Sequence, residues 1–457
     1  MAAPSSATLA SRPARNTHPL LSTEPTFPPA AAEADIHLAT LANGLRVVAI
    51  RMPQRATVSL SVFVRTGSQH ESRRLNGISH VVEHMAFKGT QTRDCQRINL
   101  DAERLGAEVN AHTDKDHTAF HLEGLARDLG AFVPMLADIV LNSTFPEEEL
   151  ERERQVILHE YTEYEEDPAL LALALFDRAC FGPHPLGQPV IGTRANLRRL
   201  ARSDLLAYVG RQYTAANVVV AAAGAIDAER FVREVETAFS AMPAGTAHVV
   251  AEPGFLGGIR SRRLGGHSQC HAVLGFATPS LRHDPVPHAL AAALFGEGMS
   301  SPLLDEIRER RGLAYYAACS ADIGPLAGQF VVEAATAPEQ AEEFLVEVTR
   351  LLRLQAEHAD PAGLQRARNQ LAVRALRGLE QPSRLVEASA LDTFTFGRPR
   401  STSSYLERLA AVTAGEVREV FASMLDSPVA AALAGRVPAA AHDRLHQLVD
   451  SGALGRR

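Results

Sequence analysis

The spacing of apolar residues predicts a series of short strands that begins near Ile36. The segments I-H-L-A-T and L-R-V-V-A-I flank Asn43-Gly44, a dipeptide that favours the tight turn of a β-hairpin. Apolar residues occupy every second position from 58 to 64, as in a strand with a buried face. A-E-V-N-A-H-T and T-A-F-H-L-E-G-L predict two more strands on either side of Lys115.

Helical spacing follows these strands, over residues 125–141. S-T-F-P-E-E-E-L predicts a helix start near Pro146, and this helix should continue through E-R-E-R-Q-V-I-L-H-E. The segment G-I-S-H-V-V-E-H-M-A, which begins at Gly77, is also predicted to lie on a helix. The apolar run N-V-V-V-A-A-A-G, residues 217–224, predicts a buried strand.

The second half of the chain repeats part of this pattern. The run at 217–224 returns as P-V-A-A-A-L-A-G at 428–435, and L-x-R-L precedes each run, at 197–200 and 406–409. Alanine-rich chains produce such matches by chance, but both matches occur in the same order. We therefore predict two related α/β halves. The predicted organisation is a disordered tail over residues 1–33, a first domain over 34–242, a linker over 243–258 and a second domain over 259–457.

The composition is typical of a soluble globular protein with more than one core. The 457 residues exceed what one hydrophobic core usually serves, and 46% apolar and 22% charged residues argue against general disorder. The net charge is -7 and no long basic stripe occurs, so nucleic acid is not an expected partner. No apolar run approaches 18 residues, so no membrane association is expected.

The first 33 residues are rich in Ala, Pro and Ser. Arg12 and Arg15 precede the first acidic residue, Glu24, a bias that is also found in transit peptides. Prolines at positions 4, 13 and 19 interrupt any amphipathic helix, and no apolar secretory core is visible. We expect a cytoplasmic protein with a plain extension, and organellar targeting by this tail stays open.

Two histidines lie four residues apart in the helix predicted after Gly77. His80 and His84 would lie on one face, one turn apart, so both imidazoles could bind a single zinc ion. Glu83 is offset around the helix and could reach a water molecule on that ion. H-x-x-E-H is the inverted form of the zinc-peptidase motif H-E-x-x-H. Two ordinary histidines remain an alternative, and catalytic zinc needs a third protein ligand.

The acidic helix after Pro146 offers candidates for this third ligand. Glu153, Ile157 and Glu160 occupy one helical stripe, at i, i+4 and i+7. Carboxylates on a face that also carries an isoleucine would be costly to bury without a cation. An exposed acidic helix is the alternative, and periodicity alone does not choose Glu160 over Glu163 or His159.

The segment F-G-E-G-M-S-S-P-L-L-D-E-I-R-E-R-R-G-L-A-Y runs from Phe295 to Tyr315. It predicts a glycine turn, a Ser301 cap with Pro302 at the first helical position, and then an amphipathic helix. A lone G-x-G is weak evidence for phosphate binding, and no dinucleotide-binding fingerprint follows.

G-I-S-H-V-V-E-H-M-A-F-K-G-T followed by E-R-E-R-x-V-I-L-x-E resembles the pitrilysin/insulinase family of inverted-motif zinc metallopeptidases. The most similar branch is that of the mitochondrial processing peptidase and its bacterial relatives. The resemblance implies Zn²⁺ as cofactor, with His80, His84 and Glu160 as ligands. It implies Glu83 as the general base and Glu153 as a second glutamate that supports the site.

The resemblance covers roughly residues 36–437 and also implies the architecture. The expected fold class is α+β: two homologous domains, each a mixed β-sheet with helices packed on one side, which form half of a clam-shell chamber. Such chambers use four domains, so the resemblance implies a homodimer or a heterodimer with a related subunit.

The segment from Phe295 is similar to the family's glycine-rich loop and helix. The resemblance implies that Arg308 and Tyr315 face the zinc from the opposite domain, where both can donate hydrogen bonds to a carbonyl oxygen or hold the substrate. A surface arginine and a packed tyrosine are the alternative. The departures from the family pattern are Glu297, where a third glycine is common, and Pro302, where a basic or polar residue is frequent.

A-E-V-N-A-H-T is similar to the edge strand on which the family binds extended peptides by backbone pairing. This implies Asn110 and Ala111 as substrate-binding residues. The nearby His112, His117 and His121 are interpreted as strand or loop residues and not as metal ligands.

We therefore expect a zinc-dependent endopeptidase that cleaves unfolded peptides or leader and presequence segments. The second half contains no H-x-x-E-H, so the metal chemistry is assigned to the first. The alternative is a partner or scaffold subunit of a heterodimeric peptidase or complex. Such subunits typically lack zinc ligands or the base, whereas this chain retains both. Acidic residues over 147–167 favour basic peptides only weakly, and the natural substrate stays open.

Overall fold

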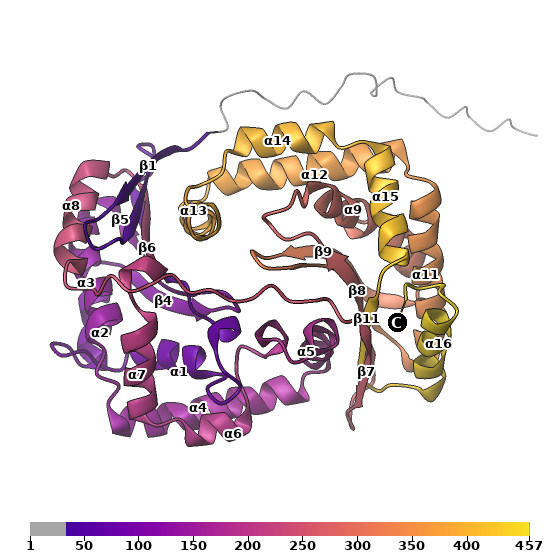
Figure 1. The fold of residues 1–457 in the computed structure, drawn as a ribbon, viewed down its shortest axis with the longest axis horizontal. Helices are drawn as coiled ribbons and strands as arrows, with labels where there is room; N and C mark the ends of the chain where they lie inside the picture. The colour runs from indigo at the N-terminus through magenta and orange to yellow at the C-terminus, as the bar shows by residue number, and fades with distance from the viewer. Residues whose placement is uncertain (1–32, 457) are drawn as a thin grey trace, which may run out of the picture.

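The protein consists of two α/β halves that lie side by side in a computed structural model, which describes residues 33–456 (Figure 1). The predicted disorder of the N-terminal tail therefore falls outside the described residues, apart from residue 33. Among the helices of residues 33–456, none combines the length and apolar character that crossing a bilayer requires. The cytoplasmic location stays a prediction.

The sheet of the first half has the strand order β1-β2-β6-β3-β5-β4 within the described chain. The pair β2 and β6 is parallel, and the other neighbours are antiparallel. The hairpin at Asn43-Gly44 and the strand over 58–64 are confirmed. The strands are β1 (Asp35–Thr40), β2 (Arg46–Arg51), β3 (Thr57–Val64), β4 (Glu108–Thr113), β5 (Thr118–Leu125) and β6 (Val218–Gly224).

The sheet of the second half has the order β7-β11-β8-β10-β9, again with one parallel pair, β7 and β11. Apart from β1, the two orders correspond strand for strand. The repeated apolar runs form corresponding strands, β6 and β11, so the two related halves predicted from the sequence are confirmed. The strands are β7 (Gly258–Arg263), β8 (Cys270–Thr278), β9 (Ala314–Ile323), β10 (Gly328–Thr336) and β11 (Val429–Gly435).

The helices repeat in the same order. Five α-helices lie between β5 and β6 in the first half and between β10 and β11 in the second. One more α-helix follows β6 and one follows β11. In the first half they are α1 (Ile78–Ala86), α2 (Cys95–Arg104), α3 (Leu129–Asn142), α4 (Glu147–Glu166), α5 (Pro168–Phe181), α6 (Arg194–Arg199), α7 (Arg202–Gln212) and α8 (Ala228–Phe239). In the second half they are α9 (Val286–Gly296), α10 (Pro302–Leu304), α11 (Ala341–Glu357), α12 (Pro361–Leu379), α13 (Pro382–Phe396), α14 (Thr402–Ala411), α15 (Ala414–Leu425) and α16 (Ala439–Asp450).

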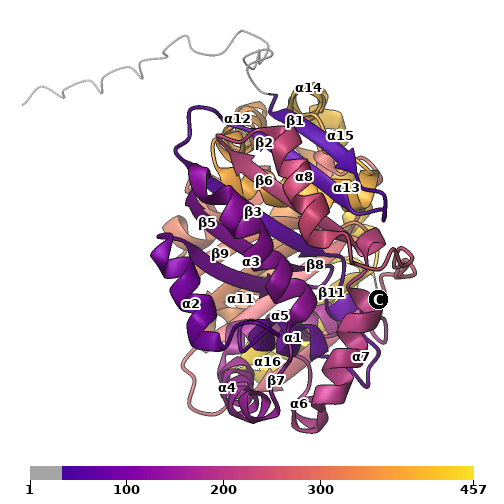
Figure 2. The same cartoon turned by 90° about the vertical axis from the view of Figure 1, so that its left-hand side faces the viewer.

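Each sheet is covered on one face by helices of its own half, as predicted. Figure 2 shows α3 and α8 in front of the first sheet. The other face is covered by one helix from the opposite half. Val386 of α13 packs with Val219 of the first sheet, and Phe176 of α5 packs with Val273 of the second. This exchange was not predicted, and its physical reason is that β6 and β11 are buried along their whole length and need cover on both faces.

The predicted domain boundaries stay predictions. Residues 243–257, within the predicted linker, form no helix or strand, and β7 begins at Gly258. The segment crosses from one half to the other, so its irregular backbone agrees with a connecting role.

The packing of α13 on the first sheet should contribute to stability. Val386 is fully buried in this contact, whereas Val373 on the neighbouring α12 is 53% exposed. Val386→Ala removes buried methyl groups and leaves a cavity, so it should lower the free energy of unfolding by about 2 kcal/mol. Val373→Ala is the matched control and should leave it nearly unchanged. Urea-induced unfolding measures both, and equal effects of the two substitutions would contradict the packing role.

Candidate metal centre

The start of α1 is held in place by a buried carboxylate. Glu71 accepts hydrogen bonds from the backbone N–H groups of Gly77, at 2.7 Å, and Ser79, at 2.8 Å. Gly77 has a φ of 100°, and a Cβ atom there would approach the Cα of Gly192 to 2.9 Å, so glycine is required. These contacts fix the first turn of α1, which carries His80.

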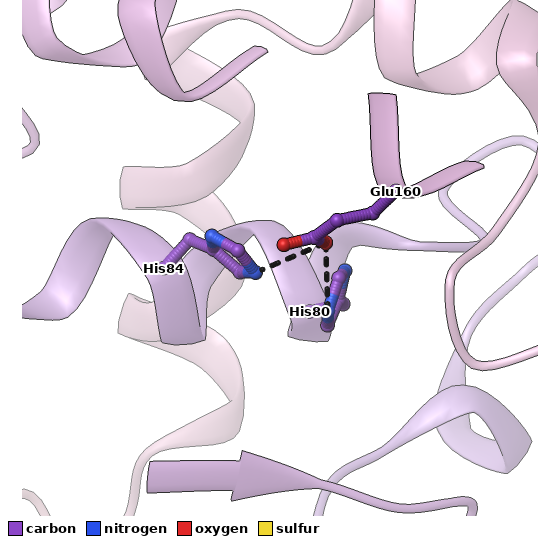
Figure 3. Close-up of side chains that lie close together, drawn as sticks. All are labelled: His80, His84 and Glu160. Atoms are coloured by element: carbon purple, nitrogen blue, oxygen red, sulfur yellow. Dashed lines mark ion pairs between the residues drawn. The ribbon is translucent and has the colours of Figure 1, made fainter. Parts of the chain in front are cut away.

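His80, His84 and Glu160 converge in space. One ligand atom from each lies within 4.8 Å of the other two (Figure 3). The Nε2 atoms of His80 and His84 lie 3.9 Å and 3.5 Å from Oε2 of Glu160. Burial, and then the neighbouring His84, lowers the pKa of His80 to about 4, so its imidazole is neutral near pH 7 and available to a metal.

The helix α4 supplies the carboxylate. Ile157 is buried on the face that carries Glu160, so this face points toward α1. The side chains of His159 and Glu163 are 78% and 71% exposed, and they lie 3.7 Å apart. The structure therefore selects Glu160, which periodicity alone did not distinguish from these two residues.

Glu153 lies behind His84, on the buried face of α4 and one helical turn before Ile157. Its Oε2 atom is 3.0 Å from Nδ1 of His84, and its Oε1 atom is 2.6 Å from Nζ of Lys88. Burial acts to raise the pKa of Glu153, but hydrogen bonds from Lys88 and His84 outweigh it and the pKa is lowered. An ionised carboxylate on Nδ1 holds the proton there and leaves Nε2 free for a metal.

Glu83 occupies the wall of a cavity of about 460 Å³ that also contains His80 and Ala111. Its Oε2 atom accepts a hydrogen bond from Oγ1 of Thr113, at 2.6 Å. Burial raises the pKa of Glu83, and the Thr113 hydrogen bond opposes this shift. The carboxylate is thus separate from the three converging ligands and faces the space beside them.

Thr113 was not identified from the sequence as a partner of Glu83, nor Lys88 as a partner of Glu153. Thr113 ends the quoted A-E-V-N-A-H-T strand, but no pattern distinguishes its hydroxyl group. Lys88 follows His84 by four residues, and this spacing was the only available signal.

Within residues 33–456, β4 is the last strand of its sheet and pairs with β5 alone, so its other edge is free. Asn110 and Ala111 lie on this edge, and Ala111 lines the cavity beside Glu83. The Oδ1 atom of Asn110 accepts a hydrogen bond from the backbone N–H of Ala111, at 2.9 Å. Both residues therefore border the place where an extended peptide could pair with the sheet.

The glycine-rich segment of the second half has the predicted cap. The Ser301 hydroxyl accepts a hydrogen bond from the backbone N–H of Leu304, and Pro302 is the first residue of α10. The helix then continues as a π-helix over Asp305–Arg310, which was not predicted. Glu297, one of the departures from the family pattern, forms an ion pair with Arg374 of α12.

Arg308 and Tyr315 are brought together at the start of β9. The guanidinium of Arg308 lies over the ring of Tyr315, 5.6 Å from its centroid, and Tyr315 is 82% exposed. The alternative of a packed tyrosine is therefore wrong. Within residues 33–456, neither side chain forms a hydrogen bond or ion pair with His80, His84 or Glu160.

The corresponding helix of the second half lacks this chemistry. Counted from the first residue of each helix, His288 of α9 corresponds to His80, but Ala291 and Ala292 correspond to Glu83 and His84. A mononuclear site with two imidazoles and one carboxylate therefore forms only in the first half at this position. This donor set is typical of catalytic zinc, which keeps one coordination position open.

Comparison with known proteins also distinguishes a first half with the metal-binding side chains from a second half without them at the corresponding helix. Residues 46–194 match the family model described as insulinase (peptidase family M16), and residues 199–371 match the peptidase M16 inactive domain. The chain is 34% identical over 419 residues to the uncharacterized zinc protease Rv2782c of Mycobacterium tuberculosis, covering 89% of this chain and 94% of that protein. An uncharacterized zinc protease of Rickettsia bellii is 30% identical over 88% of this chain and 98% of that protein.

Solved structures share the fold. A protease from Helicobacter pylori has a TM-score of 0.82 at 20% identity, covering 88% of this chain and all of that chain. A chain of Complex III2 from Candida albicans has a TM-score of 0.79 at 17% identity, covering 92% and 99% of the two chains. The zinc-protease relatives and the His-His-Glu cluster together fit Zn²⁺ as the cofactor. The chain belongs to the insulinase family, peptidase family M16.

Proposed function

We propose that this protein is a zinc-dependent endopeptidase that cleaves unfolded peptides, including leader or presequence segments. The observation that carries the proposal is the convergence of His80, His84 and Glu160 beside a cavity that also holds Glu83. Zinc bound there supplies Lewis acidity, which makes water more acidic and polarises a carbonyl group.

The free edge of β4 is the proposed substrate platform. An extended peptide can pair its backbone with Asn110 and Ala111, which gives affinity with little demand on side-chain sequence. This position brings the peptide along the cavity wall that contains Glu83. Folded proteins offer few extended segments, so unfolded peptides are the preferred substrates.

Glu83 is the proposed general base. Its partly desolvated carboxylate accepts a proton from the attacking water, and the same carboxyl group then donates a proton to the leaving amine. The hydrogen bond from Thr113 fixes the orientation of this carboxylate. Arg308 and Tyr315 donate hydrogen bonds to the carbonyl oxygen as negative charge develops on it, or hold the substrate backbone.

The likeness to a chain of Complex III2 supports a second candidate, a partner or scaffold subunit. The retained ligands and base favour the peptidase. We propose that the active form is a homodimer or a heterodimer with a related subunit, because residues 33–456 form two such domains and the chambers implied by the family resemblance use four. Peptide cleavage by the purified chain alone would support self-sufficiency, whereas cleavage only after addition of a related chain would support the heterodimer.

Substitution of the base should separate chemistry from metal binding. Glu83→Gln should retain the zinc ion of the candidate metal centre but reduce cleavage of an unstructured fluorogenic peptide by several orders of magnitude, because Gln cannot accept the proton. His84→Ala is the control and should also lose the zinc ion of the candidate metal centre. Elemental analysis and peptide cleavage measure the two effects. Retained cleavage in Glu83→Gln would remove Glu83 as the base.

The carboxylate behind His84 should affect zinc affinity. Glu153→Gln weakens the hydrogen bond that orients the imidazole, so the dissociation constant for zinc should rise by about 10- to 100-fold. Glu163→Gln on the exposed face of the same helix is the matched control and should bind zinc normally. Competition with a chromophoric chelator gives both constants, and identical constants would contradict an orienting role.

The hydroxyl group of Tyr315 should matter only for catalysis. Tyr315→Phe should lower kcat/KM by about 100-fold, as expected for loss of one oxyanion donor, with zinc content unchanged. Tyr316→Phe is the matched control, because the Tyr316 hydroxyl group donates to Glu333 instead. Steady-state kinetics on the same peptide test the difference. Normal activity of Tyr315→Phe would exclude its hydroxyl group from the reaction.

A further inference from the structure

A second group of metal-binding side chains lies between the two halves, outside the candidate metal centre. His112 belongs to β4, His117 lies just before β5, and Glu387 belongs to α13 of the second half. One ligand atom from each lies within 4.8 Å of the other two. Both histidines were interpreted from the sequence as strand or loop residues and not as metal ligands. No local pattern could link them to Glu387, because Glu387 belongs to the other half of the chain.

The two imidazoles have a separation that suits a shared ion. The Nε2 atoms of His112 and His117 lie 3.1 Å apart. Two nitrogens bound tetrahedrally to one zinc ion, with bonds of about 2.0–2.1 Å, lie about 3.3 Å apart. In the absence of an ion the same two nitrogens share a proton, and a metal ion would replace that proton.

The orientation of His117 is fixed by a carboxylate. Its Nδ1 atom lies 2.7 Å from Oδ1 of Asp116, and its side chain is 3% exposed. A carboxylate at Nδ1 retains the proton on that nitrogen and directs the lone pair of Nε2 toward a metal. His84 and Glu153 have the same relationship in the candidate metal centre, at 3.0 Å.

The carboxylate of Glu387 completes the group from the opposite side. Among the described residues, no hydrogen bond or ion pair engages the carboxylate of Glu387. It follows Val386, whose burial against the first sheet fixes the helix position. Glu387 and His117 line a cavity of about 580 Å³, and His112 lines the cavity beside Glu83, so an ion has a route to the group.

We propose that His112, His117 and Glu387 form a second site for a divalent transition-metal ion, which ties the edge strand β4 to α13. Two imidazoles and one carboxylate favour ions such as Zn²⁺ over Mg²⁺ or Ca²⁺. The ion would also stabilise the end of β4, where Thr113 donates its hydrogen bond to Glu83. Such a site joins the substrate platform to the opposite half.

Zinc titration of the metal-free, full-length protein tests the proposal. The His84→Ala background disables the candidate metal centre, so any remaining stoichiometric site is the second one. We expect one zinc equivalent in His84→Ala, and at least about 100-fold weaker binding in His84→Ala/Glu387→Ala. His84→Ala/His121→Ala is the matched control, because the His121 ring lies 5.5 Å from that of His112 but outside the group. This control should keep the equivalent.

Two results of this titration would overturn the proposal. Absence of stoichiometric zinc in His84→Ala would mean that the two imidazoles share only a proton. Equal affinities of His84→Ala and His84→Ala/Glu387→Ala would mean that the ion binds elsewhere.

Thermal unfolding provides an independent readout. Zinc should raise the Tm of His84→Ala by stabilising the contact between the halves, and should not raise that of His84→Ala/Glu387→Ala. Mg²⁺ should have no such effect on either protein. An equal rise with Mg²⁺, or an equal rise in both proteins, would also overturn the proposal.

Discussion

The candidate metal centre depends on the placement of three carboxylates around two imidazoles with little compensating positive charge. Glu83, Glu153 and Glu160 surround the histidines of α1. Among residues 33–456, Lys88 forms its ion pair with Glu153 and with no other carboxylate. Partly buried carboxylates are costly unless a cation is near them. A divalent ion held by His80, His84 and Glu160 would supply this charge. The same arrangement that brings these carboxylates together therefore also favours the binding of a metal ion among them.

Much of the fold was predictable, because its signals are local. The hairpin at Asn43-Gly44 and the repeated apolar runs depend on neighbouring residues, and the structure confirms them. The exchange of α5 and α13 was not predictable. A run such as N-V-V-V-A-A-A-G indicates that both faces of its strand are covered, but it contains no information about which distant helix covers each face.

In the metal centre too, the residues with a local sequence signal were predictable, and those that depend on distant contacts were not. His80 and His84 were predictable from their spacing on one helix, whereas Glu160 needed the family resemblance, since its helix offers several acidic residues. The structure resolves this choice through the burial of Ile157 on the same face. The role of Thr113 as a partner of Glu83 was hidden, because it arises from contact between a strand end and a helix that are apart in sequence.

The reciprocal placement of α5 and α13 has the geometry of a domain-swapped dimer that has been joined into one chain. These helices occupy corresponding places in the two repeats, and each covers the sheet of the other repeat. Neither half can therefore bury both faces of its own sheet without the other. The second half is thus an obligatory structural complement of the first, although its α9 carries alanines at the places of Glu83 and His84.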